Sequence, residues 1–271
     1  MSPTPPKGFV LFVTPAFGSS YTSELAVEIS RFIAANTPLA KKLCLVNMST
    51  HPGATERTTN HYGPGLTELL SASAHGAPRL DHFLVSTAFG FDALACGAPH
   101  APLSPSQLSA LTARLRAIYD YLVVLTPTAE RYNSFFTGYS LKTGVDSFTL
   151  LISSNTVSSM SAISFYDEIT ELPEIDDPWT RSRIGALELT TAEIPAQPYT
   201  EGPWKLGTIV LPRAMTRHTR GAYHPISGSA PAFDSALEGV LRYALGSSSR
   251  FIDSKSDLLG HPPTPQISQL S

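Results

Sequence analysis

Strand-like and helix-like stretches alternate along most of the chain, and this alternation limits the possible folds more than any other feature. The run GFVLFVT at residues 8–14 is continuously apolar, as expected of a strand that is buried on both faces. The stretch SYTSELAVEISRFIAAN that follows carries Leu25, Ile29 and Phe32 along one helical stripe. Because the alternation continues to about residue 212, the sequence predicts a doubly wound, mostly parallel sheet with helices on both faces.

The spacing of apolar residues and turn residues places the other elements of this fold. Further strands are expected at 42–48, 82–88, 121–127, 145–153 and 205–212, with a short extended piece at 91–97. Further helices are expected at 66–72, 104–120, 129–141 and 156–170, and residues 49–65 are expected to form a loop. Residues 171–203 are acidic and rich in proline, so they predict an insertion. We expect a single α/β domain over residues 1–250 and a disordered Ser/Pro-rich tail over 251–271.

Composition narrows the range of partners and the expected compartment. A formal net charge of −3 and a pI near 6.2 provide no basic field, so binding to nucleic acid is not expected. No run approaches the ~18 consecutive apolar residues of a membrane span, and the start MSPTPPKG lacks the apolar core of a signal peptide. The sequence therefore predicts a cytoplasmic protein without direct membrane insertion. Cys44 and Cys96 are expected to be small buried side chains that hold no metal.

The segment between the first strand and the first helix has the layout of a phosphate-binding loop without its charge. Such loops read G-x-x-x-x-G-K-[ST], because glycines let backbone N–H groups approach the phosphates while the Lys binds the terminal phosphate. Residues 15–20 offer only Gly18, and no Lys occurs between Lys7 and Lys41. The sequence predicts that the turn keeps its shape because the fold needs a connection there, although its ligand has been lost.

Two longer stretches resemble one protein family. PGLTELLS at residues 64–71 is similar to the motif P-G-L-[ST]-[DE]-x-L. LACGAPHAPLSPSQLSALTARLRAIYDYLVVLTP at residues 94–127 is similar to L-x-x-G-x-x-P-x-[NS]-P-x-[EQ]-L followed by a helix and Y-D-[YF]-[VI]-[IV]-[IV]-D-T-P-P. Both motifs are those of the bacterial tyrosine kinases of capsule and exopolysaccharide systems (BY-kinases), which this chain therefore resembles. That family is a branch of the MinD/ParA-like P-loop proteins. The resemblance extends over about residues 8–211 and implies a P-loop NTPase-like fold.

The resemblance also implies a catalytic site, and each of its parts is replaced in this chain. The Walker A Lys and hydroxyl fall on Ser19 and Ser20, which carry no positive charge. The two Asp after the second strand fall on Asn47 and Ser49, and the Asp of the central strand falls on Leu125. An apolar side chain cannot coordinate Mg²⁺, which takes oxygen ligands. Because phosphoryl transfer depends on positioning and charge neutralisation, we expect neither kinase nor ATPase activity.

Other parts of the family pattern are missing as well. The chain has no Tyr after Tyr243, whereas the family carries a tyrosine cluster there, and the base-reading Asn falls on Pro212. The ring-forming E-x-x-R-x-x-R segment before the first strand is absent. Glu28 and Arg31 match half of that motif but lie in a different helix, so they are interpreted as a solvated helix pair.

The sequence thus predicts a catalytically inactive BY-kinase-like protein without a cofactor, with ATP and Mg²⁺ not favoured. The resemblance implies that it regulates or scaffolds exopolysaccharide synthesis and export. The resemblance also implies that the chain binds the cytoplasmic segment of an inner-membrane polysaccharide co-polymerase. This partner would recruit the chain to the inner membrane. The chain could also form homo-oligomers, as the resemblance allows. The surface for this partner is assigned to Trp179, Trp204 and Arg217.

Several alternatives stay open from sequence alone. The Trp residues fit packing against their own domain equally well, and the basic stretch around Arg217 fits either an anion site or a solvated loop. His51 and His61 have no further ligand at metal-binding spacing. The chain could instead be an unorthodox ATPase or kinase of the same pathway that uses Ser19, Ser20 and a cation from a neighbouring subunit. A third reading is a MinD/ParA-like positioning protein.

Overall fold

The strands form one sheet in a computed structural model that describes residues 8–37, 42–49, 52–73, 76, 78–97, 103–128, 147–170, 183–191, 205–216 and 230–246. The strand order is β3-β4-β2-β5-β1-β6-β7-β8. The strands are β1 (Phe9–Pro15), β2 (Leu43–Asn47), β3 (Leu84–Ser86), β4 (Asp92–Leu94), β5 (Tyr121–Leu125), β6 (Ser147–Ser153), β7 (Ile184–Thr191) and β8 (Lys205–Leu211). The pair β3 and β4 is antiparallel, and the other pairs of this described sheet are parallel.

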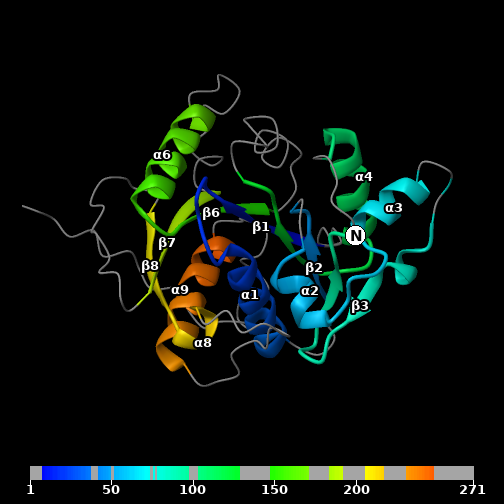
Figure 1. Cartoon of the computed structure of the whole chain (residues 1–271), viewed down its shortest axis with the longest axis horizontal. Coiled ribbons are helices and arrows are strands. Elements are labelled where there is room, and N and C mark those ends of the chain that lie inside the picture. Colours follow the sequence, from blue (N-terminus) through cyan, green and yellow to red (C-terminus); the bar gives the residue numbers. More distant parts are fainter. Residues whose placement is uncertain are drawn as a thin grey trace, which may run out of the picture.

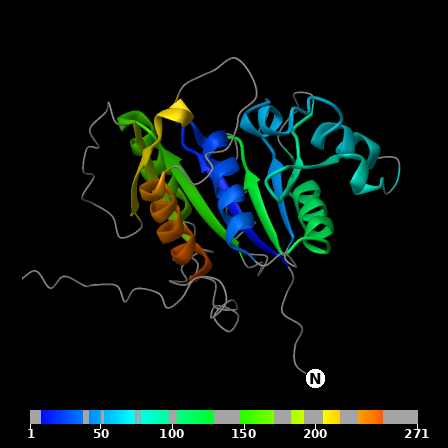
Figure 2. The same cartoon turned by 90° about the horizontal axis from the view of Figure 1, so that it is seen from below.

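Helices cover both faces of this sheet (Figure 1). They are α1 (Thr22–Asn36), α2 (Ala54–Thr59), α3 (Leu66–Ser73), α4 (Pro105–Arg116), α6 (Thr156–Thr170), α8 (Arg213–Thr216) and α9 (Pro231–Gly246), with a 3-10 turn η1 (Leu80–His82). Helices α1, α2, α8 and α9 lie on one side, and α3, α4 and α6 lie on the other. Figure 2 shows α1 and α9 next to each other across the first side. The doubly wound α/β fold predicted from the sequence is confirmed.

The central strands are apolar throughout because both of their faces are buried. In β1, Leu11 and Val13 belong to the core under α1 and α9, whereas Val10 and Phe12 belong to the core under α3 and α4. Adjacent residues of a strand point to opposite faces, so a strand between two helical layers must be apolar at every position. This is why the run GFVLFVT was informative. The strand that it forms pairs with β5, with Phe9 beside Tyr121.

Four elements of the described chain, namely α2, β7, α8 and α9, lie in segments where the sequence predicted no such element. Helix α2 begins at Ala54 within the predicted loop 49–65. Strand β7 lies within the predicted insertion 171–203 and pairs with both β6 and β8, so the insertion interpretation is wrong for residues 184–191.

Other sequence predictions are confirmed, corrected or fall outside the described residues. Helix α4 ends at Arg116, four residues before the predicted end of the helix at 120, and Ile118 is 44% exposed. Its start is confirmed, because the Ser104 side chain accepts a hydrogen bond from the Gln107 N–H. The predicted helix 129–141 and the tail 251–271 lie outside the described residues.

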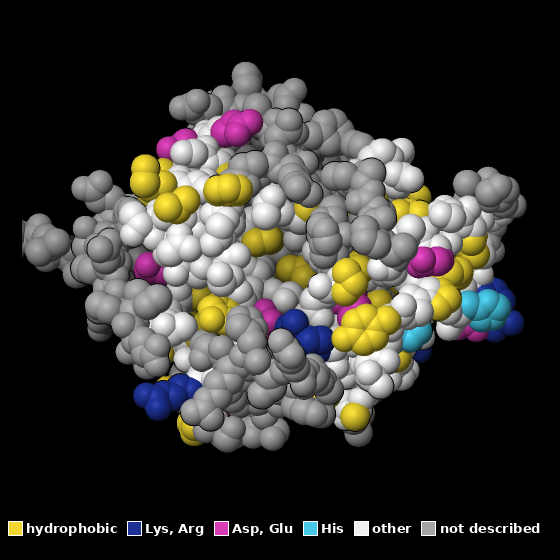
Figure 3. Space-filling model, viewed as in Figure 1, with side chains coloured by type: hydrophobic (Ala, Val, Ile, Leu, Met, Phe, Trp, Pro, Cys, Tyr) yellow, Lys and Arg dark blue, Asp and Glu magenta, His cyan; other side chains and the backbone are white. Residues whose placement is uncertain are grey.

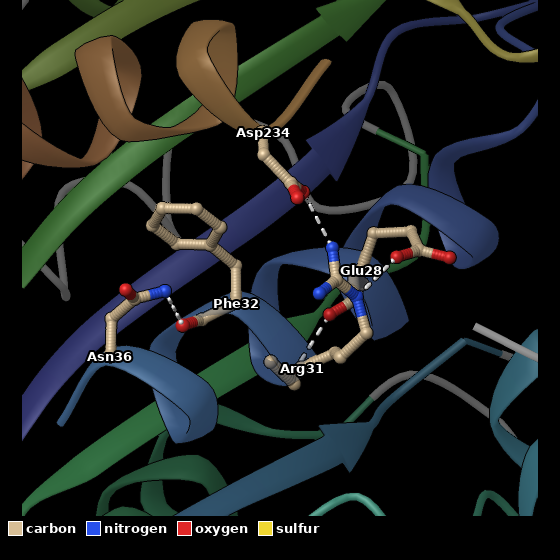
Figure 4. A network of polar contacts seen from close by, with 7 residues as sticks. Glu28, Arg31, Phe32, Asn36 and Asp234 are labelled. Atoms are coloured by element: carbon tan, nitrogen blue, oxygen red, sulfur yellow. Dashed lines mark hydrogen bonds and ion pairs between the residues drawn. The ribbon is translucent and has the colours of Figure 1, made fainter. Parts of the chain in front are cut away.

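A buried ion network joins α1 to α9 (Figure 4). The Arg31 Nε lies 2.8 Å from a Glu28 carboxylate oxygen, and its Nη2 lies 2.6 Å from an Asp234 oxygen. Burial alone would lower the pKa of Arg31, but its hydrogen bonds to Glu28 and Asp234 raise that pKa above the usual value. Because Glu28 has no exposed surface, the interpretation of Glu28 and Arg31 as a solvated pair is wrong. The bond between Arg31 and Asp234 anchors α9 to the rest of the domain.

Candidate functional site

The turn between β1 and α1 lies at the carboxyl edge of the sheet, where parallel α/β folds bind their ligands. Val13 of β1 and Asn47 of β2 both pair with Leu125 of β5, so three central strands end beside one another. Gly18 has a φ of 74° and Tyr21 has a φ of 63°, so two left-handed residues carry the chain into α1. The positions that the resemblance assigned to a nucleotide site therefore lie along this edge.

The backbone N–H groups of the turn donate hydrogen bonds to other groups of the chain. The Phe17 N–H donates to the Ser161 Oγ at 3.2 Å, and the Ser20 N–H donates to the Ser154 Oγ at 2.8 Å. The Ser19 N–H donates to a carbonyl oxygen of the turn itself. In a phosphate-binding loop such N–H groups point at the phosphate oxygens instead. Three of the donors that a phosphate would need are thus already engaged.

Residues just before α6 and in its first turn hold the β1–α1 turn in place. The Asn155 Nδ2 donates to the Gly18 carbonyl oxygen at 2.9 Å. The Ser158 Oγ accepts from the N–H groups of Ser154 and Asn155 at 2.8 and 3.0 Å. Sequence analysis missed this role of the SSNTVSS stretch, although clustered Ser and Asn residues before a helix are a signal for capping. The turn is consequently fixed by uncharged side chains.

Asn47 and Ser49 occupy the place assigned to the two metal-binding and catalytic Asp residues. The Asn47 Oδ1 accepts from the Ser49 N–H at 3.0 Å and from the Ser49 hydroxyl at 2.5 Å. The Asn47 Nδ2 donates to the Glu56 carboxylate at 2.8 Å. The amide of Asn47 is thus used on both sides, and it is completely buried.

Glu56 supplies a carboxylate that sequence analysis did not identify. Besides Asn47, it accepts hydrogen bonds from the Gly53 N–H at 2.5 Å and from the Cys96 N–H at 2.9 Å. It is 1% exposed, so these donors stand in for water around the charge. Burial and the neighbouring Glu56 raise the pKa of the Cys96 thiol to about 12. The only sequence signal was the glycine three residues before Glu56, a spacing typical of helix starts.

Leu125 contributes no polar side chain to this edge. It is 3% exposed and belongs to the core under α1. The residue that follows it, Thr126, donates its hydroxyl hydrogen bond to the Thr14 Oγ1 at 3.1 Å and contacts the Pro127 carbonyl oxygen at 2.9 Å. The ends of β1 and β5 are therefore linked to each other and present no carboxylate.

A cation does lie near the start of α1, but it is paired. Arg57 of α2 forms an ion pair with Glu24 of α1, and the Ser23 hydroxyl also donates to Glu24 at 2.9 Å. Figure 3 shows basic and acidic side chains next to each other at the surface between α1 and α2. The Arg57 side chain is 33% exposed, so this pair lies at the rim of the edge. Neither member was singled out from the sequence.

The PGLTELLS motif places α3 against the end of β4. The Gly65 N–H donates to the Glu68 carboxylate at 2.8 Å, and the Leu66 N–H donates to the Ala95 carbonyl oxygen at 2.8 Å. A Cβ at position 65 would lie 2.5 Å from the Ala95 carbonyl oxygen. The glycine is thus required by a close backbone approach, and the contacts of the motif are structural.

The residues at this edge do not fit ATP with Mg²⁺. The turn carries no Lys, three of its N–H groups are engaged, Leu125 offers no oxygen, and Asn47 is held by Glu56. Within the described ranges, no group of three His, Cys, Asp or Glu side chains could hold a metal ion. His61 lies 3.1 Å from the Pro64 carbonyl oxygen through its Nε2. Trp179, Trp204, Arg217 and His51 lie outside the described residues.

Comparison with known proteins places the fold. No family model matches the chain, and no curated protein sequence matches it. The ParA family ATPase from Chlorobium tepidum superimposes with a TM-score of 0.57 and 16% identity, covering 93% of this chain and 94% of that one. A chain of the MinC:MinD cell division protein complex from Aquifex aeolicus superimposes with a TM-score of 0.58 and 16% identity, covering 87% of this chain and 95% of that one. This chain has the ParA/MinD-like P-loop NTPase fold. At such identities the likeness concerns the fold alone.

The tyrosine kinase part of the resemblance receives weaker support. The kinase domain of the Escherichia coli tyrosine kinase ETK matches with a TM-score of 0.49 and 18% identity, covering 74% of this chain and 73% of that domain. That value is too low to carry an argument.

Among the helices of the described residues, none has the length and apolarity needed to cross a membrane.

Proposed function

We propose that this chain is a protein-binding domain without catalytic activity, built on a ParA/MinD-like fold. The observation that supports the proposal most is the engagement of the turn's N–H groups by Ser154 and Ser161. A nucleotide would have to break these bonds and would find no Lys in return. The replacement of the acidic positions by Asn47, Ser49 and Leu125 points the same way.

The partner we propose is the cytoplasmic segment of an inner-membrane polysaccharide co-polymerase. Support comes from the similarity of residues 64–71 and 94–127 to BY-kinase motifs, because that resemblance implies a partner of this kind. A binding surface can keep its affinity after the chemistry of a site is lost, since fold and function are separable. Under this proposal the chain regulates or scaffolds exopolysaccharide export at the inner membrane.

Thermal unfolding with millimolar ATP or ADP and Mg²⁺ tests the loss of nucleotide binding. A ligand that binds only the folded state raises its apparent stability by RT ln(1 + [L]/Kd). We expect no change in Tm, whereas a ParA family ATPase treated in the same way should be stabilised. A rise of several degrees for this chain would contradict the proposal.

A nucleotide-binding positioning protein is the second candidate, and Arg57 is the observation that favours it. Its guanidinium lies at the first turn of α1, next to the β1–α1 turn, and could leave Glu24 for an anion. If nucleotide raises Tm and the Arg57→Ala variant loses that rise, this candidate replaces the first. An Arg242→Ala variant is the matched control, because Arg242 is paired with Glu238 on α9.

A further inference from the structure

We propose that Phe17, Val157 and Met160 form a docking site for an uncharged apolar helix of another protein. These three side chains, called the Phe17 patch below, are 59%, 60% and 60% exposed. The proposal rests on the proposed function, because it gives a place on this chain to the partner of a binding domain. It does not depend on which protein that partner is.

The three side chains come from two segments that are bonded together. Val157 and Met160 are three residues apart in α6, so they project from the same face of that helix. Phe17 lies in the β1–α1 turn, and its N–H donates to the Ser161 Oγ of α6 at 3.2 Å. Figure 3 shows hydrophobic side chains gathered at the surface over α6, with acidic side chains beyond them. The patch is thus carried by two segments that a hydrogen bond joins.

The exposure of the patch is fixed by the structure. The Asn155 Nδ2 bond to the Gly18 carbonyl oxygen holds the turn that carries Phe17. On α6, Ala162 and Phe165 are 2% and 6% exposed, so they occupy the inner face and leave Val157 and Met160 outside. A segment whose backbone is already held in place loses little backbone conformational entropy when a partner covers it. Large apolar side chains presented in this way are typical anchors of an interface.

The two segments that carry the patch are uncharged, and this indicates the chemistry of its partner. Residues 14–23 and 153–166 contain no Asp, Glu, Lys or Arg, although charged residues are 15% of the chain. The side chains of these two segments offer no ionic attraction to a phosphate or to a charged segment. Burying it against an apolar segment desolvates no ion, so this segment is the favoured occupant. At its margin, the partner segment should carry Ser, Thr, Asn or Gln side chains rather than charged ones.

The size and shape of the patch favour a short helix over a second copy of this chain. A stable interface between two folded proteins takes roughly 20–30 residues from each side, whereas the patch has three apolar anchors. Val157 and Met160 form a ridge on α6, and a ridge of this kind packs into the groove between side chains of another helix. A single uncharged helix with an apolar face is enough to cover the three anchors.

Site-specific photo-cross-linking of the full chain in its own cells identifies what covers the patch. The photoreactive amino acid p-benzoylphenylalanine replaces Met160. In a control it replaces Ile118, which is 44% exposed and lies between α4 and the amino end of β5, whereas the patch lies at the carboxyl ends of the strands. The cross-linked peptide is sequenced, and the same segment is synthesised. Its Kd is then measured with the purified chain and with Phe17→Ser, Met160→Asp and Ile118→Asp variants, each checked for folding by circular dichroism.

The expected result is a cross-link from position 160 alone, to an uncharged helical segment whose affinity falls about tenfold in Phe17→Ser and Met160→Asp. The Ile118→Asp variant should bind within about twofold of the natural chain. A cross-link to another copy of this chain, to a charged segment, to the same products from both positions, or to nothing would overturn the proposal. Nucleotide is absent from this experiment, so its failure is distinct from a nucleotide-induced rise in Tm, which would overturn the proposed function instead.

Discussion

Gly65 is a residue whose identity is set by its neighbours rather than by a ligand. A Cβ at this position would lie 2.5 Å from the Ala95 carbonyl oxygen and 2.7 Å from the Gly97 nitrogen, both of them backbone atoms. We expect Gly65→Ala to lower the free energy of unfolding by about 1–3 kcal/mol, because the backbone must shift. Urea unfolding followed by circular dichroism measures this change.

The matched control for this change is Gly239→Ala. Gly239 lies in α9, and a Cβ there meets no atom within 4 Å. Alanine should raise the free energy of unfolding by about 0.5–1 kcal/mol through its better helix propensity. Equal effects at the two positions would mean that Gly65 is not constrained by β4.

Asn47 is a second residue where one functional group decides what the site tolerates. Its amide can donate to the buried Glu56 carboxylate at 2.8 Å, whereas an Asp in its place could not. We expect Asn47→Asp to lower the free energy of unfolding by about 2–4 kcal/mol at about pH 8, because two carboxylates would face each other without water. Urea unfolding at about pH 5 and about pH 8 tests this.

The pH dependence of this variant has a defined sign. Repulsion raises the pKa of the introduced aspartyl carboxyl above its unfolded value of about 3.9. Stability relative to the natural chain is therefore kept below about pH 4 and is lost as the pH rises through the raised pKa. Asn60→Asp, at an exposed position, should show almost none of this dependence. An Asn47→Asp variant as stable as the natural chain at about pH 8 would indicate that a cation neutralises the pair.

At the scale of elements, α1 connects the candidate site to the last helix. Its first turn carries Glu24, which pairs with Arg57, and its middle carries Arg31, which pairs with Glu28 and Asp234. Helix α9 packs on the same face of the sheet through Leu237 and Leu241, among others. The network in Figure 4 therefore lies between two apolar surfaces rather than in solvent.

Arg31→Met should lower the free energy of unfolding by about 2–4 kcal/mol, because it removes the cation from a Glu28 carboxylate that has no exposed surface. The value should fall below that of a fully buried pair, since Asp234 is 26% exposed. Differential scanning calorimetry gives the change. Arg79→Met is the control, because Arg79 and Asp81 are 74% and 57% exposed and their pair should add nothing measurable. Similar losses in both variants would contradict the buried network.

The elements that the sequence predicted well are those with one strong apolar period. β1 and α1 were found because a strand buried on both faces and a helix with one buried stripe leave clear patterns. Helix α2 was missed because its six residues, ATERTT, contain only one apolar core residue, Ala54. Strand β7 was missed because Glu188 and Thr190 interrupt its apolar run, although both are buried in the sheet.

The candidate site shows the same limit at the level of side chains. Positions aligned with a known motif, such as Asn47 and Leu125, could be located from the sequence because each follows a strand. Glu56 and Ser161 could not, since they reach the edge of the sheet from α2 and α6 through contacts that depend on the tertiary structure. Pairs distant in sequence leave no local pattern.

At the scale of the whole molecule, the two cysteines report how the sheet opens. Both thiols are buried, as predicted, and both are free. Burial, with Asp92 nearby, raises the pKa of Cys44 far above its usual range, and burial with Glu56 nearby raises that of Cys96 to about 12. Unfolded thiols have a pKa of about 8.5, so the two cysteines should not change the folding stability below that pH. It should fall as the pH rises from about 8.5 towards 12.

We therefore expect native thiols to react with a disulfide reagent only through opening of the chain, since the thiolate is the reactive form. Cys44 lies in β2, between β4 and β5, so it should require global unfolding. Cys96 follows β4 next to the α3 start, so a smaller opening should expose it, and it should react faster. Labelling rates of Cys44→Ala and Cys96→Ala variants in increasing urea separate the two. Equal rates with equal urea dependence would mean that this edge of the sheet opens only with the whole domain, and that α3 has no local mobility of its own.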